Sequence, residues 1–130
     1  MTIQAKILII DDDAVFIKAT QAVLESKNYQ VSSALDGDEG LKKAKQDKPD
    51  LIILDIIMPA KDGFAACEQL KSDPELERVP VLIMTSFSEK GKETNIPTSA
   101  GFNLEAEDYA EKPLSPEELL RRVEKLLKRS

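Results

Sequence analysis

Three short apolar runs constrain the fold of this chain most strongly, because each ends in a charged or hydroxyl side chain. The runs read "KILIIDDD" (6–13), "DLIILD" (50–55) and "VPVLIMTS" (79–86). Runs of consecutive aliphatic residues without polar alternation are typical of strands that are buried on both faces. Such strands belong to parallel sheets covered by helices on both sides. The runs therefore predict an α/β fold whose strands end in polar groups.

Amphipathic stretches separate these runs and complete the pattern. Helices are expected over 14–27, 36–48 and 64–73 and after Ser115, with Asp13 as N-cap of the first helix and a Ser115/Glu118 capping box on the last. Weaker strands are expected over 29–34 and 107–112. Right-handed crossovers then give a doubly wound five-stranded parallel sheet in the order 2-1-3-4-5. We expect residues 1–130 to form a single domain of this type.

One segment departs from the alternation of strands and helices. A helix is expected between the fourth and fifth strands, but Gly91, Pro97 and Gly101 interrupt the sequence there. Proline inside a helix costs about 3 kcal/mol. We therefore expect an irregular or broken fourth helix within residues 87–106.

Composition excludes several classes of function. The net charge of −6 disfavours direct binding of nucleic acid, and no apolar stretch is long enough to span a membrane. The absence of histidine excludes Ser-His-Asp chemistry and zinc sites that use histidine ligands. The one cysteine, Cys67, cannot form an internal disulfide and is expected to be a small core residue of a helix. A cytoplasmic protein is the expectation.

The predicted sheet brings two acidic strand ends together. In a 2-1-3-4-5 order the winding reverses between the first and third strands, which end in Asp11-Asp12 and in Asp55. Two carboxylates about 4 Å apart repel by roughly 4 kcal/mol at an effective dielectric constant near 20. A hard cation such as Mg²⁺ relieves this repulsion, and its remaining positions attract phosphate oxygens. The other carboxylate is then available as a nucleophile for phosphoryl transfer.

Two further strand ends provide groups that suit a phosphoryl ligand. Thr85 ends the fourth strand and offers a hydroxyl donor, and Lys112 ends the fifth and offers a single positive charge. Four strand ends thus carry Asp-Asp, Asp, Thr-Ser and Lys-Pro in order.

These motifs together resemble the receiver domain of response regulators in two-component phosphorelay signalling. The resemblance rests on "IIDD" (9–12), "LDIIMPAKDG" (54–63), "IMTS" (83–86) and "DYAEKP" (108–113). Each motif is weak by itself, but their order on successive strand ends is specific.

The resemblance implies a role for each residue of the site. Asp55 accepts the phosphoryl group, Mg²⁺ is held by Asp12, Asp55 and the backbone carbonyl of Ile57, and Asp11 acts through a bound water. Lys112 pairs with the phosphoryl group or with Asp55, Thr85 moves toward the phosphate, and Tyr109 turns inward behind it. Apolar Ile57 and Phe87 flank the phosphoryl group and predict slow self-dephosphorylation.

The same resemblance implies partners. The donor is a sensor histidine kinase or a histidine phosphotransfer protein, the downstream target is open, and a homodimer is compatible with the family. The chain length does not distinguish a stand-alone receiver from part of a larger regulator. The stretch from Thr85 to Lys112 is longer than is usual in the family, which leaves the surface of the fourth helix open.

Two alternatives remain at this point. A receiver-like adaptor that is never phosphorylated would use the same fold, although such adaptors usually lose the acidic residues retained here. A phosphohydrolase of the haloacid-dehalogenase type also uses an aspartate nucleophile, but it needs a second aspartate two positions later. That position is Ile57 in this chain.

Overall fold

A five-stranded parallel sheet forms the centre of the computed structural model, which describes residues 5–55, 63–85, 107–112 and 114–129. Its strands lie in the order β2-β1-β3-β4-β5, and every neighbouring pair is parallel. Their bounds are β1 Lys6–Ile10, β2 Gln30–Ala34, β3 Leu51–Asp55, β4 Val81–Thr85 and β5 Asp108–Glu111. The predicted doubly wound sheet is confirmed.

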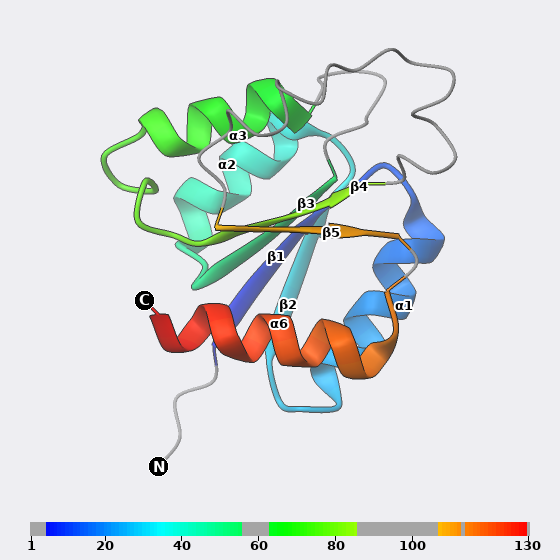
Figure 1. Cartoon of the computed structure of the whole chain (residues 1–130). Helices are drawn as coiled ribbons and strands as arrows, with labels where there is room; N and C mark the ends of the chain where they lie inside the picture. Colours follow the sequence, from blue (N-terminus) through cyan, green and yellow to red (C-terminus); the bar gives the residue numbers. More distant parts are fainter. Residues whose placement is uncertain (1–4, 56–62, 86–106, 113, 130) are drawn as a thin grey trace.

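Helices cover both faces of this sheet (Figure 1). The helices α2 and α3 lie on one face, and α1 and α6 lie on the other. Their bounds are α1 Ala14–Glu25, α2 Gly37–Asp47, α3 Gly63–Ser72 and α6 Pro116–Arg129. The expected broken fourth helix falls within residues 86–106, which lie outside the described residues.

The helix starts follow from capping side chains. Asp13 Oδ1 accepts hydrogen bonds from the backbone N–H groups of Val15 and Phe16, so the predicted N-cap of α1 is confirmed. Ser115 Oγ accepts from the Glu118 N–H at the start of α6. The Glu118 carboxylate in turn accepts from Arg121 and Arg122, and these bonds lower the pKa of Glu118.

The sheet separates two apolar clusters. Alternate residues of each central strand point into one cluster or the other, so that Ile10 and Leu54 pack beneath α2 and α3 while Ile9 and Ile53 pack beneath α1 and α6. The four aliphatic residues of β3 are buried, as their sequence predicts, and Asp55 at the end of the strand is buried as well. Cys67 is a buried core residue of α3, as expected. The ends of the central strands are held between these two clusters, which fixes the positions of the side chains that they carry.

A buried lysine fixes the start of β5. The ammonium of Lys71 lies 2.8 Å from Glu107 Oε1 and donates to the carbonyls of Glu77 and Val79. The same Glu107 carboxylate accepts from the N–H of Val81 at the start of β4. The Lys71 side chain is 6% exposed, so this ion pair is largely shielded from solvent. It ties α3, β4 and β5 together at the amino ends of the strands.

Gly40 provides a test of the packing between α2 and β1. A Cβ atom at this position would lie 2.5 Å from Ile10 Cδ1 and 2.7 Å from Ile10 Cγ1, and Ile10 is fully buried. We expect Gly40→Ala to lower the free energy of unfolding by about 1 kcal/mol, because overpacking outweighs the helix propensity gained. Urea denaturation measures the change. Ala22→Gly, in an exposed part of α1, is the control for propensity alone, and an unchanged or raised stability of Gly40→Ala would contradict the packing.

None of the helices in the described part of the chain is long and apolar enough to cross a membrane.

Candidate functional site

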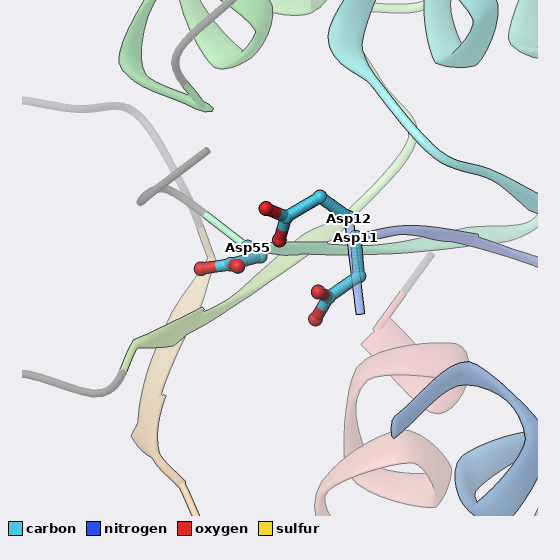
Figure 2. Close-up of side chains that lie close together, drawn as sticks. All are labelled: Asp11, Asp12 and Asp55. Atoms are coloured by element: carbon cyan, nitrogen blue, oxygen red, sulfur yellow. The ribbon is translucent and has the colours of Figure 1, made fainter. Parts of the chain in front are cut away.

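Three carboxylates meet at the carboxyl ends of β1 and β3. Asp55 is the last residue of β3, and Asp11 and Asp12 directly follow β1. One carboxylate oxygen from each of the three lies within 4.8 Å of the others. Figure 2 shows the Asp12 and Asp55 carboxylates directed toward the same space, with Asp11 beside them. The predicted meeting of these strand ends is therefore present in the structure.

The three carboxylates differ in their exposure. Asp11 and Asp55 are each 1% exposed, whereas Asp12 is exposed to solvent. Burying ionised carboxylates is costly unless cations or hydrogen bonds compensate the charge. The cluster therefore needs a positive charge, and Asp12 is its member nearest to solvent.

Lys112 supplies a positive charge from the end of β5. Its ammonium lies 2.7 Å from Asp11 Oδ2 and 3.7 Å from Asp55 Oδ2. The Lys112 side chain is 16% exposed, so solvent screens these contacts only in part. The resemblance implied that Lys112 pairs with the phosphoryl group or with Asp55, and the structure places its shorter contact on Asp11. One ammonium thus bridges two of the three acidic side chains.

The N-cap of α1 is linked to the same site. The N–H of Asp13 donates to Asp11 Oδ1 at 2.9 Å, while Lys112 binds the other oxygen of that carboxylate. Asp13 itself caps α1. Both oxygens of Asp11 therefore have donors, and the orientation of Asp11 depends on the first turn of α1 and on β5.

The donor set fits a divalent metal ion. Three carboxylate oxygens that lie close together are hard ligands of the kind that Mg²⁺ prefers, and the exposed Asp12 leaves room for water ligands. The carbonyl of Ile57 lies outside the described residues, so its predicted part in the metal site stays a prediction.

The predicted threonine stands on the neighbouring strand. Asp55 pairs with Met84 in the register of β3 and β4, and Thr85 is the next residue. Thr85 pairs with Glu111 in β5, directly before Lys112. The backbone of Thr85 therefore lies at the same edge of the sheet as Asp55 and Lys112. The role predicted for its hydroxyl stays a prediction, as does the part of Phe87, which is outside the described residues.

Tyr109 lies in β5, half-buried against the apolar cluster that includes Cys67. Burial raises the pKa of the Tyr109 hydroxyl, and Cys67 and Glu107 raise it further. The backbone carbonyl of Tyr109 accepts from Arg122 of α6, which also binds Asp108. The Tyr109 side chain thus lies on the α2 and α3 side of the sheet, while its backbone is tied to α6 on the other side; its predicted movement stays a prediction.

The sequence did not reveal one neighbour of the site. The ammonium of Lys112 lies 4.1 Å from the centroid of the Phe16 ring, which comes from the first turn of α1. In the sequence, Phe16 is one of several apolar residues of an amphipathic helix. Its place directly after an acidic strand end and an N-cap is the signal that could have drawn attention to it.

A model of the response regulator receiver domain matches residues 7–124 of this chain. The chain belongs to this family. The resemblance stated from the four motifs is therefore confirmed, and the fold is that of a CheY-like receiver domain. Receiver domains are in general signalling modules and do not turn over separate substrates. Membership of the family therefore implies a part in signalling that depends on phosphorylation.

The receiver domain is similar to curated proteins of larger size. It is 40% identical over 125 residues to the alkaline phosphatase synthesis transcriptional regulatory protein PhoP of Bacillus subtilis, covering 96% of this chain and 49% of PhoP. The chain thus spans about half the length of that relative.

Solved structures share the fold along nearly the whole chain. The chemotaxis response regulator CheY4 of Vibrio cholerae superposes with a TM-score of 0.82 at 28% identity, covering 95% of this chain and 99% of CheY4. The receiver domain of the sensor histidine kinase PA1611 from Pseudomonas aeruginosa PAO1 gives a TM-score of 0.84 at 25% identity, covering 97% and 99%. That structure holds a magnesium ion in its active site cleft.

Proposed function

We propose that this receiver domain, residues 1–130, is a switch that accepts a phosphoryl group on Asp55. The observation that carries the proposal is the position of the buried Asp55 carboxylate, within 4.8 Å of Asp11 and Asp12 and 3.7 Å from the ammonium of Lys112. A nucleophilic carboxylate with a lysine beside it suits the transfer of a phosphoryl group, whose catalysis depends on positioning and on neutralising charge.

Each residue of the site has a part in this proposal. Asp12 and Asp55, with the carbonyl of Ile57, hold Mg²⁺, and Asp11 acts through a water ligand. Bound Mg²⁺ supplies positive charge for the oxygens of the transferring group. Lys112 moves its contact from the carboxylates to the phosphoryl oxygens, and the Thr85 hydroxyl donates to the same group.

The proposed output is a change in the face formed by the fourth helix, β5 and α6. Phosphorylation converts the singly charged Asp55 carboxylate into an acyl phosphate that carries nearly two negative charges, and contacts to this group favour one of two conformations. Tyr109 is the proposed reporter, because its side chain packs on the core while its backbone carbonyl accepts a hydrogen bond from Arg122 of α6. The donor is a sensor histidine kinase or a histidine phosphotransfer protein in the cytoplasm, and the downstream target is open.

Treatment of the purified chain with acetyl phosphate tests the proposal. We expect the intact mass to rise by one phosphoryl group when Mg²⁺ is present and to stay unchanged when EDTA removes the metal. The dependence on metal follows from the three carboxylates, which repel an incoming phosphate unless a cation is bound. No gain of mass in Mg²⁺ would contradict the proposal, and so would equal gains with and without EDTA.

A small phosphoester tests the alternative activity. We expect no turnover of p-nitrophenyl phosphate, because Ile57 replaces the second aspartate that a haloacid-dehalogenase phosphatase needs. The adaptor alternative predicts no phosphorylation at all, which the acetyl phosphate experiment measures directly.

A further inference from the structure

The ring of Phe16 lies against the ammonium that bridges the acidic site. The distance from Lys112 Nζ to the ring centroid is 4.1 Å, well inside the range of about 6 Å over which an aromatic face attracts a cation. The same ammonium lies 2.7 Å from Asp11 and 3.7 Å from Asp55. Lys112 is therefore held between two carboxylates and an aromatic ring.

The position of the ring is itself fixed. The N–H of Phe16 donates to Asp13 Oδ1 in the cap of α1, and the side chain is half-buried against the cluster beneath α1 and α6. The N–H of Asp13 binds Asp11, which binds Lys112 through its other oxygen. Ring, cap and carboxylate thus form one connected unit around the ammonium.

A ring in this place affects a lysine in two ways. Its electron-rich face attracts the ammonium, and its bulk excludes some of the water that would otherwise solvate a flexible four-carbon side chain. Lysine loses considerable rotamer freedom when it is held, so a neighbour that restricts it beforehand lowers the cost of its contact with a ligand. Aliphatic side chains can fill the same space, but they lack the attraction of an aromatic face.

We propose that Phe16 is a positioning residue for Lys112, which holds the ammonium where it can meet a phosphoryl group on Asp55. This inference rests on the proposed function of Asp55 and Lys112. It adds that the rate of phosphoryl transfer depends on an aromatic side chain in the first turn of α1.

Three variants separate positioning from packing. Phe16→Leu keeps an apolar side chain but removes the ring, and Phe16→Tyr keeps the ring. Val23→Ala is the matched control, because Val23 packs against the same cluster two turns further along α1. We expect phosphorylation by acetyl phosphate in Mg²⁺ to be about five-fold slower in Phe16→Leu, and within about twofold of the wild type in Phe16→Tyr and Val23→Ala. Urea denaturation confirms that each variant is folded at the assay temperature.

A second measurement does not depend on phosphorylation. The ε-carbon of Lys112 is bonded to the ammonium that lies over the ring, so the NMR signal of its protons is expected upfield of the other lysines. The signal is assigned by its loss in Lys112→Arg. We expect the upfield shift to disappear in Phe16→Leu and to persist in Phe16→Tyr.

The outcomes distinguish the inference from the function beneath it. A wild-type chain that shows the upfield lysine signal but never gains a phosphoryl group would overturn the proposed function. A wild type that is phosphorylated at the same rate as Phe16→Leu would overturn the positioning role alone. Equal slowing in Phe16→Leu and Val23→Ala would also overturn it, because loss of packing would then explain both.

Discussion

Asp55→Asn is expected to lower phosphorylation by acetyl phosphate roughly a thousandfold or more, at any concentration of Mg²⁺. Asparagine matches the shape of aspartate, so the fully buried end of β3 keeps its packing. The amide, however, is a far weaker nucleophile than a carboxylate. Intact-mass spectrometry over time, with the wild type as reference, measures the loss.

The neighbouring aspartates provide the control for this experiment. Asp13→Ser removes an acidic group next to the site but keeps a residue that can cap α1, so phosphorylation is expected to continue. Asp11 is engaged by the Asp13 N–H and by Lys112, and it is not expected to replace Asp55 as acceptor. A phosphorylated Asp55→Asn protein would show that another side chain is the nucleophile.

Lys112→Met is expected to lower the free energy of unfolding by about 3 kcal/mol when EDTA is present. Removing one partner of a buried ion pair leaves a charge uncompensated, which typically costs 3–5 kcal/mol. Here Asp11 and Asp55 are both buried, and the lysine is slightly exposed, which places the effect toward the lower end. Methionine retains most of the apolar length of the side chain. Urea denaturation in EDTA gives the value.

Addition of Mg²⁺ provides a further test of this variant. A divalent ion that binds the folded state stabilises it, and it also restores the positive charge that the variant lacks. Mg²⁺ is therefore expected to raise the stability of Lys112→Met more than that of the wild type. Lys45→Met is the control, because the Lys45 side chain is 61% exposed and its pair with Asp73 contributes at most about 1 kcal/mol. Equal losses in the two variants would mean that Lys112 does not compensate the acidic cluster.

The sheet and much of the acidic site could be predicted from sequence for a simple physical reason. Apolar runs identify strands because they must be buried, and the rules of parallel topology place the ends of β1 and β3 side by side. The strand order by itself therefore predicts that Asp12 and Asp55 lie close together. The cap at Asp13 was equally predictable, because capping depends on a few adjacent residues.

Contacts between distant side chains could not be predicted in this way. Lys112 and Asp11 are 101 positions apart, and only the folded backbone decides that the ammonium reaches Asp11 more closely than Asp55. The position of the Phe16 ring depends on the rotation of α1, which no strand pattern fixes. The ion pair between Lys71 and Glu107 was also missed, because a lysine in an amphipathic helix is expected to be solvated.

In this receiver domain the strand ends carry the residues of the candidate site, and the helices form the outer surface. The side chains of the candidate site stand at strand ends held between two apolar clusters, and the exposed helix residues that the structure describes lie outside both clusters. Substitutions on those outer surfaces can therefore retune which proteins recognise the domain and leave the reactive geometry intact. A design that aims at a new kinase partner could therefore substitute exposed helix residues and keep every strand residue unchanged.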